Sequence, residues 1–265
     1  MATIKAFTNF GLNMERLDFS FLLENSFHTR TDTVLEGLDH RFTGTGITYN
    51  SESVPNGGGF TSYAKWQYGN QEWSLAGVSI AVRALVEVAK TPRLYDERAL
   101  MELVLSGDDE ITGANMNDVL FGSYGKDQIS GGLGRDTIDG GYGDDTLFGG
   151  RGGDKLYGGE GADTFAFKKS DSLKASSLHD TIYDFSKSEH DKIDLHLIDA
   201  NTKKNGDQAF KFIGQQDFHD KAGELRYEKK GSGSFVYGDT NGDGATDLVV
   251  KFDDPISFAK GDLVL

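Results

Sequence analysis

An aspartate recurs every nine residues between Val104 and Ala166, and this period constrains the fold more than any other feature of the sequence. Written in nines from Val104, the segments read VLSGDDEIT, GANMNDVLF, GSYGKDQIS, GGLGRDTID, GGYGDDTLF, GGRGGDKLY and GGEGADTFA. The sixth position holds Asp109, Asp118, Asp127, Asp136, Asp145, Asp154 and Asp163, and the eighth holds Ile111, Leu120, Ile129, Ile138, Leu147, Leu156 and Phe165. This agreement at two chemically distinct positions indicates a structural repeat rather than a glycine-rich acidic linker.

The period predicts a flattened coil built from two nonamers. The last three residues of each nonamer are strand-like, with the apolar eighth side chain turned inward, and the glycines before them turn the chain because they tolerate positive φ. Stacked coils place the aspartates of repeats n and n+2 roughly 4.8 Å apart, which is one inter-strand spacing. Carboxylates at that separation cannot all stay charged without a cation between them. We therefore expect a metal ion at each pair.

The available ligands favour calcium. Backbone carbonyls of the glycine turns add oxygen atoms to the carboxylates, and the repeats contain neither histidine nor cysteine. A flexible cage of many oxygen ligands suits calcium better than zinc, and better than the stricter octahedron of magnesium. The glycines expected to contribute to these sites are Gly125, Gly132, Gly134, Gly141, Gly143, Gly150, Gly152, Gly159 and Gly161.

The negative net charge of the chain favours a cation as its binding partner. Acidic residues outnumber basic ones 42 to 27, and the net charge of -15 argues against nucleic acid and anionic membrane surfaces as direct partners. Between Val104 and Ala166 there are 12 acidic and 4 basic residues. Mutual repulsion should therefore hold this region open until a cation binds.

The nonamer resembles the GGxGxDxUx repeat of the RTX (repeats-in-toxin) family. The resemblance implies a calcium β-roll with about five ions, between Asp109 and Asp127, Asp127 and Asp145, Asp145 and Asp163, Asp118 and Asp136, and Asp136 and Asp154. The first repeats depart from the pattern, because Val104 and Leu105 replace the leading glycines and Met116 replaces the fourth-position glycine of the second repeat. This departure weakens the first site on each edge.

The resemblance continues after the repeats. The stretch from Asp163 to Leu195 resembles the segment that caps the roll in serralysin-type proteases, and the region from Val104 to Leu265 is similar to the R-modules of mannuronan epimerases. These families imply an antiparallel β-sandwich at the C-terminal end. Alternating runs such as AFKFIG, SFVYGD and DLVVKF agree with short strands.

The loop DTNGDGATD offers a second kind of metal site. Its oxygen-bearing side chains are Asp239, Asn241, Asp243 and Asp247, and Gly244 provides the sharp bend. Val250 stands where an EF-hand needs an acidic residue, so the loop is not an EF-hand. The alternative is a polar hairpin turn without metal.

The first hundred residues lack nonamers and contain both tryptophans. SYAKWQYGNQEWSLAG predicts a hairpin with Gly69-Asn70 as its two-residue turn, which pairs Tyr68 with Gln71 and Trp66 with Trp73. The resulting aromatic face is either a sugar-stacking platform or the inner face of a β-sandwich. In TPRLYDERALMELVL, Thr91 as N-cap and Pro92 as first residue predict a helix that caps the roll.

Export is expected from the two ends of the sequence and from its repeats. The first residues form no Sec-type signal, and no stretch approaches the roughly 20 apolar residues of a membrane span. The ending Asp262-Leu263-Val264-Leu265 resembles the uncleaved signal of proteins exported by type I (ABC transporter) systems, although a terminal strand would end the same way. We expect a secreted protein, extracellular or associated with a cell surface.

No familiar catalytic motif accompanies these features. The six histidines form no HExxH pair, there is no GxSxG elbow, and the chain has no cysteine. We expect a mainly all-β, non-catalytic protein that binds polysaccharide or a surface; the alternatives are an enzyme with an unrecognised N-terminal site and a membrane-active factor. The expected parts are a β-rich module (1–90), a capping helix (91–105), the calcium β-roll (104–166) and a β-sandwich carrying the export signal (167–265).

Overall fold

The computed structural model describes residues 105–169, 171 and 179–265, together with the backbone of six strands nearer the N-terminus. Those six strands are β1 (Thr3–Ala6), β2 (Thr29–Arg30), β3 (Val34–Glu36), β4 (His40–Tyr49), β5 (Pro55–Gln67) and β6 (Asn70–Ala81). The predicted helix over residues 91–105 lies outside the described residues except for its last position. Its capping role therefore stays a prediction.

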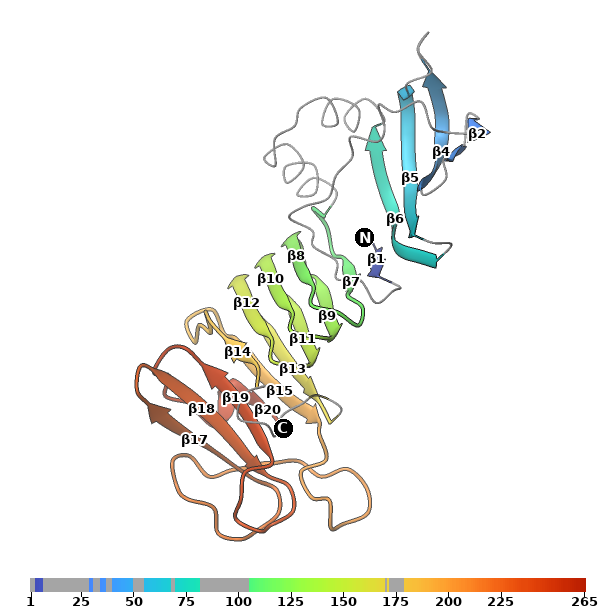
Figure 1. Ribbon diagram of the computed structural model, residues 1–265. Helices are drawn as coiled ribbons and strands as arrows, with labels where there is room; N and C mark the ends of the chain where they lie inside the picture. Colours follow the sequence, from blue (N-terminus) through green and yellow to red (C-terminus); the bar gives the residue numbers. More distant parts are fainter. Residues whose placement is uncertain are drawn as a thin grey trace.

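The nonamers form two stacked layers of parallel strands (Figure 1). One layer contains β7 (Glu110–Thr112), β9 (Gln128–Leu133), β11 (Thr146–Arg151) and β13 (Thr164–Lys168). The other contains β8 (Val119–Tyr124), β10 (Thr137–Tyr142) and β12 (Lys155–Glu160). Successive nonamers alternate between the layers, so each coil consists of two nonamers, as the period predicts.

The strand register follows the repeat. Ile138 lies beside Leu120 on one side and beside Leu156 on the other, and Leu147 lies beside Ile129 and Phe165 in the opposite layer. These eighth-position side chains are 0–1% exposed, which confirms their inward orientation. Burial of each one contributes about 1.5 to 3 kcal/mol. The core of the roll is therefore a double column of aliphatic side chains with Phe165 at one end.

The coils approach one another most closely at the turn glycines. Gly143 has φ of +129°, and a Cβ atom at this position would collide with the carbonyl oxygen of Gly125 in the coil below. A side chain is therefore excluded both by the backbone conformation and by the space. All nine glycines predicted to serve the metal sites share this positive φ.

The C-terminal region differs from the antiparallel β-sandwich expected for it. Its strands are β14 (Thr181–Ile182), β15 (Lys192–Leu197), β16 (Lys211–Phe212), β17 (Glu224–Lys230), β18 (Gly233–Asp239), β19 (Leu248–Phe252) and β20 (Leu263–Val264). Antiparallel pairing is confined to β17–β18–β19, whereas β14, β15 and β20 add to the two layers of the roll in parallel. The sandwich prediction was wrong for β14, β15 and β20, because these strands extend the two parallel layers of the roll instead of pairing antiparallel.

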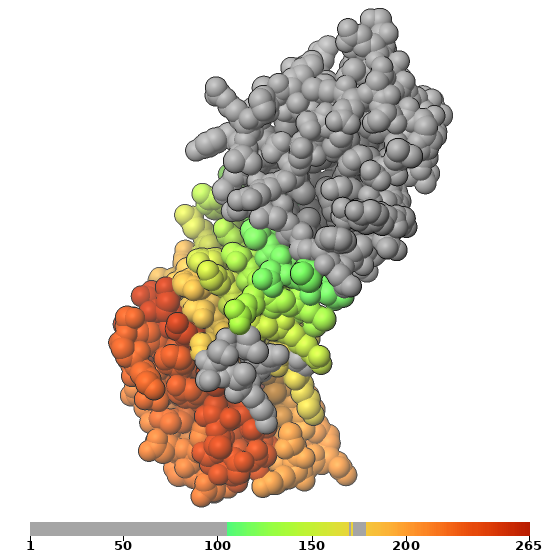
Figure 2. All heavy atoms as spheres, in the orientation of Figure 1, coloured from blue at the N-terminus to red at the C-terminus, as the bar shows by residue number. Residues whose placement is uncertain are grey.

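The roll strands therefore belong to two longer sheets. One has the order β2-β3-β4-β5-β6-β1-β7-β9-β11-β13-β15-β20, and the other has the order β16-β17-β18-β19-β14-β12-β10-β8. The short 3₁₀ helix η3 (Lys260–Asp262) precedes β20. Because one sheet contains strands of the N-terminal region, the roll and the C-terminal region, secondary structure alone marks no boundary between these three parts, and the four-part division stays a prediction. In the space-filling view the roll and the C-terminal region form one continuous body (Figure 2).

The N-terminal hairpin is confirmed, but its predicted register is wrong. Strands β5 and β6 pair antiparallel with Gln67 opposite Asn70, so two residues, 68 and 69, lie between them instead of Gly69-Asn70. Trp66 faces Gln71, and Trp73 faces Lys65 across an irregularity in the ladder. The register differs by one residue because glycine suits either position of a two-residue turn. The choice between a sugar platform and a core face stays open.

Candidate functional site

The seven ladder aspartates lie where the chain passes from one layer of the roll to the other. Each precedes a strand by one residue, and all seven are 0–2% exposed. Their side chains stack in two columns, as predicted. Along each column the backbone N–H of one aspartate donates to Oδ1 of the aspartate 18 residues later, at 2.7 to 2.9 Å.

The second carboxylate oxygen of most ladder aspartates is buried without a hydrogen-bond partner. This holds for Oδ2 of Asp127, Asp136, Asp145, Asp154 and Asp163. A buried polar atom left without a partner costs about 1 to 3 kcal/mol, and more when it carries charge. A repeated set of such atoms indicates that a positive group binds there.

Three of the unpartnered oxygens, those of Asp127, Asp136 and Asp145, lie near a backbone carbonyl from another coil. A side chain at Gly131 would collide with both Oδ2 of Asp136 and the carbonyl oxygen of Gly149, and one at Gly140 would collide with Oδ2 of Asp145 and the carbonyl of Gly158. Two oxygen atoms of negative partial charge thus share one small space. A hard cation with oxygen ligands fits this donor set, so the residues present suit calcium.

These carbonyls identify glycines that the sequence analysis missed. The glycines expected from the sequence to serve as ligands are those with positive φ, whereas the carbonyls beside the unpartnered oxygens belong to the first glycine of a repeat. The constant glycine at position one could have identified them, because any side chain there would fill the space between the oxygens. These residues are Gly131, Gly140, Gly149 and Gly158.

The first site of one edge differs from the others. The backbone N–H of Ala114 donates to Oδ2 of Asp118 at 2.8 Å, so a protein group already contacts the oxygen that is left without a partner in later repeats. This repeat is one of those that depart from the glycine pattern. The contact agrees with the weaker site expected there.

Within the described part of the chain, no group of three or more histidine, cysteine, aspartate or glutamate side chains is placed to hold a metal ion. The ladder sites therefore rely on one or two carboxylates supplemented by backbone carbonyls. This arrangement depends on coil stacking, because a single unfolded nonamer cannot bring its carboxylate beside the carbonyl of another coil.

The residues of the 239–247 loop contact the backbone of the loop itself. Oδ1 of Asp239 accepts N–H groups of Asn241 and Gly242, and its Oδ2 accepts that of Gly244 at 2.9 Å. Asp243 accepts the N–H of Ala245, and Asp247 accepts both the N–H and the hydroxyl of Thr240. These contacts hold the turn that joins β18 to β19 and fit either a polar hairpin turn or a metal loop, so the second metal site stays a prediction.

The environment of the ladder raises the pKa of its carboxyl groups from the ordinary 3.8. The pKa is raised to about 7 for Asp127, Asp136 and Asp163 and to about 6 for Asp145. Burial is the main cause, and neighbouring carboxylates act in the same direction, while backbone N–H donors oppose them. Without a cation, the stacked roll therefore favours protonated aspartates.

We expect metal-free protein to be more stable at pH 5 than at pH 8. Between an unfolded pKa near 3.9 and a folded pKa near 7, the folded state holds more protons, so stability falls as pH rises through this window. Calcium needs the deprotonated carboxylates, so its apparent affinity should rise over the same range. The residual far-UV circular dichroism in chelator and calcium titrations, each at both pH values, test these opposite trends; parallel trends would contradict the assignment.

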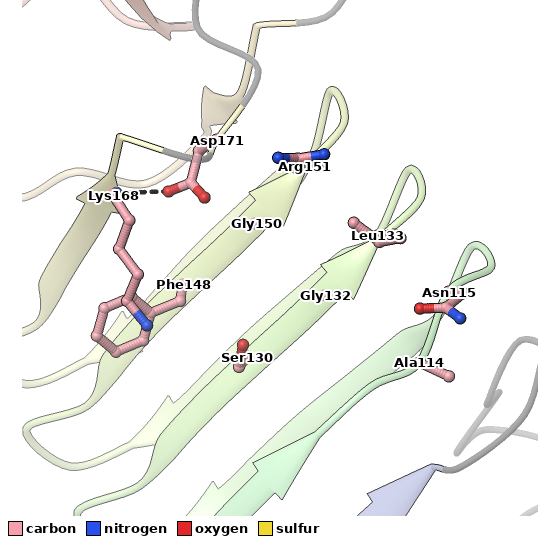
Figure 3. Close-up of a pocket in the computed structure, with 10 residues that line it drawn as sticks. All are labelled: Ala114, Asn115, Ser130, Gly132, Leu133, Phe148, Gly150, Arg151, Lys168 and Asp171. Atoms are coloured by element: carbon pink, nitrogen blue, oxygen red, sulfur yellow. Dashed lines mark hydrogen bonds between the residues drawn. The ribbon is translucent and has the colours of Figure 1, made fainter.

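A groove of about 340 Å³ lies on the outer face of the twelve-stranded sheet (Figure 3). Phe148 provides a flat ring with Lys168 Nζ 4.2 Å from its centroid, and Arg151 and Asp171 lie at one end. Ser130 and Leu133 also line the groove. This groove could not be predicted from the sequence, because its residues come from three strands and a following turn.

The opposite layer carries exposed aromatic rings. Tyr124 and Tyr142 stack with centroids 4.9 Å apart and planes 7° apart, and they are 47% and 51% exposed. Neighbouring coils therefore place equivalent side chains in a row on the outer surface. No helix in the described part of the chain is both long and apolar enough to cross a membrane.

Comparison with known proteins agrees with this geometry. The family model for the C-terminal domain of peptidase M10 serralysins matches residues 76–265. Two solved structures are similar to the chain: the AlgE6R2 subunit of the Azotobacter vinelandii mannuronan C5-epimerase, at 26% identity, and the AlgE6R3 subunit of the same enzyme, at 24%. The first likeness covers 59% of this chain and 92% of that one with a TM-score of 0.43, and the second covers 60% and 78% with 0.27.

No curated protein matches the chain. The family model nevertheless spans the described roll and everything after it. The aspartate ladders, the buried aliphatic columns and this match agree with one another, and the chain belongs to the serralysin C-terminal family, with an RTX-type calcium-binding β-roll.

Proposed function

We propose that this protein is exported, that its β-roll folds when it meets extracellular calcium, and that the folded protein is a non-catalytic module that binds extracellular polysaccharide. The observation that carries the proposal is the two columns of buried Oδ2 atoms without hydrogen-bond partners, at Asp127, Asp136, Asp145, Asp154 and Asp163. These atoms make the stacked roll unfavourable until a cation binds.

Calcium concentration would control the folding. Extracellular calcium modules bind at about 10⁻⁴ to 10⁻³ M, well above the free calcium of a cytosol. Because each site needs oxygens from different coils, it does not exist in the unfolded chain, and binding energy becomes folding energy. The chain would therefore stay open in the producing cell and close outside it.

Membership of the serralysin C-terminal family supports secretion, and the C-terminal Asp262-Leu263-Val264-Leu265 resembles a type I export signal. In the folded protein Leu263–Val264 forms β20 beside β15. The export role of these residues would thus be exercised before folding, while the strand is still free.

The groove on the outer face of the roll suits a sugar chain. Phe148 offers an aromatic surface against which the apolar face of a sugar ring can pack. Ser130, Arg151 and Lys168 supply hydrogen-bond donors for hydroxyl or carboxylate groups of the sugar. The groove lies across three stacked strands, so it forms only when the roll is closed.

We expect calcium-loaded protein to be retained on columns of alginate or another extracellular glycan, and chelated protein to pass through. Phe148→Ala should reduce retention at least tenfold, because it removes the aromatic surface of the groove. The matched control is Tyr142→Ala, which truncates an exposed ring on the opposite layer. Equal losses in both variants, or retention without calcium, would contradict the assignment to the groove.

The same samples distinguish the other functions considered for the chain. Cleavage or modification of the glycan by calcium-loaded protein would replace the binding role by an enzymatic one. Release of dye from anionic vesicles would favour a membrane-active factor. The proposal predicts neither result.

A further inference from the structure

Two aspartates outside the nonamers extend the ladders. The backbone N–H of Asp154 donates to Oδ1 of Asp180, and that of Asp163 donates to Oδ1 of Asp191, both at 3.0 Å. This is the bond that joins successive coils, although the separations here are 26 and 28 residues instead of 18. Each of these aspartates is followed two positions later by a buried isoleucine that continues the aliphatic column, Ile182 or Ile193.

The two ends of the ladders differ chemically. Oδ2 of Asp191 accepts the backbone N–H of Ser186 at 2.8 Å, so both oxygens of this carboxylate have protein donors. Oδ2 of Asp180 is buried and has no hydrogen-bond partner, and the residue is 2% exposed. The Asp180 end therefore has a buried carboxylate oxygen without a protein donor, whereas the Asp191 end does not.

The free oxygen of Asp180 lies in the same small space as that of Asp154. A Cβ atom placed on Gly149 would lie 2.6 Å from Oδ2 of Asp154 and 3.1 Å from Oδ2 of Asp180. At Gly131 and Gly140 the equivalent space is bordered by one carboxylate oxygen and one carbonyl oxygen. At Gly149 a second carboxylate takes the place of the carbonyl, so this space carries more negative charge than those within the repeats.

Two buried carboxylates that face one space need either a shared proton or a cation between them. We propose that Asp154 and Asp180 bind a further calcium ion where the roll meets the C-terminal region, and that Asp191 ends the other ladder without an ion. The inference rests on the proposed calcium-dependent function and adds a site to those formed within the nonamers. This ion would tie the segment that contains β14 to the roll, so docking of the C-terminal region would depend on calcium.

The number of bound ions tests this site. Full-length protein is dialysed against excess calcium, and bound calcium is counted by atomic emission. Asp180→Asn should bind one ion fewer than the wild type. Asp191→Asn, which alters the other ladder end, and Asp139→Asn, which removes one exposed charge from the roll, should bind as many as the wild type.

The outcomes separate the inference from the function on which it rests. Wild-type protein that binds no calcium would overturn the proposed function, whereas equal counts in wild type and Asp180→Asn would overturn only the additional site. If Asp180→Asn does not fold in calcium, crystals of calcium-loaded wild type decide the question by anomalous scattering. A calcium peak beside Gly149 between the two carboxylates supports the site, and its absence there overturns it.

Discussion

Removal of calcium is expected to abolish most of the β structure of the roll, and calcium near millimolar concentration should restore it. Each ion contributes about 1.4 kcal/mol when its concentration is ten times the dissociation constant. Five ions would then contribute about 7 kcal/mol, which is comparable to the whole stability of a typical domain, about 5 to 15 kcal/mol. The unpartnered oxygens of Asp127, Asp136 and Asp145 make this contribution necessary.

Far-UV circular dichroism and tryptophan fluorescence in one calcium titration measure this effect. Circular dichroism reports the β structure of the roll together with that of the other strands, whereas fluorescence reports only the region before the roll, because both tryptophans, Trp66 and Trp73, precede the repeats. Coincident changes would show that the N-terminal strands fold upon the roll, as the pairing of β1 with β7 suggests. A change in circular dichroism alone would show that they fold independently.

Magnesium at the same concentrations serves as the control, since it demands a stricter octahedron and gives up its water reluctantly. It should restore little of the lost signal. Chelated protein that keeps its full β signal, with calcium confirmed absent, would show that the ladders form a preformed scaffold. The proposed function would then lose its basis.

The roll itself could be predicted from the sequence because its information is local and repeated. Aspartate at the sixth position and an aliphatic residue at the eighth specify the two ladders and the core, and the structure places all seven of each as expected. With a period of nine residues, few chain arrangements bury the side chain at the eighth position of every nonamer. The neighbours of a residue such as Ile138 in the adjacent coils can therefore be predicted from the spacing alone.

The ends of the roll could not be predicted in the same way. Asp180 and Asp191 occupy ladder positions, but the chain between them and the preceding coil has a different length from a repeat. Their only local marks are the short patterns Asp-Thr-Ile and Asp-Lys-Ile, which match positions six to eight of the nonamer. Such three-residue patterns are too short to identify a ladder position unless the strand register is already known.

The C-terminal strands and the N-terminal hairpin show a second limit. Alternating residues identify a strand but not its partner, so β19 could be foreseen while its parallel pairing with β14 could not. In the hairpin, glycine permits two neighbouring registers, and the structure has Gln67 opposite Asn70. Pairing is decided by contacts between distant segments, which the local sequence does not contain.

Replacing a single turn glycine should destabilise the calcium-loaded roll strongly. At Gly143 the φ of +129° is unfavourable for any residue with a Cβ atom, and that atom would overlap the carbonyl oxygen of Gly125. Backbone strain costs about 1 to 3 kcal/mol and overpacking about as much again. Gly143→Ala should therefore lower the free energy of unfolding by about 2 to 6 kcal/mol, measured by urea unfolding in saturating calcium.

Gly231→Ala separates the two contributions. Gly231 lies in the turn between β17 and β18 with φ of +66°, and no atom lies within 4 Å of the position of its Cβ. Only the left-handed backbone penalises alanine there, at about 1 to 2 kcal/mol. If the close stacking of coils is what requires glycine in the roll, Gly143→Ala must cost clearly more than Gly231→Ala and must also weaken calcium binding. Equal losses would mean that backbone conformation alone explains the glycine pattern, and that the coils have room to separate around a side chain.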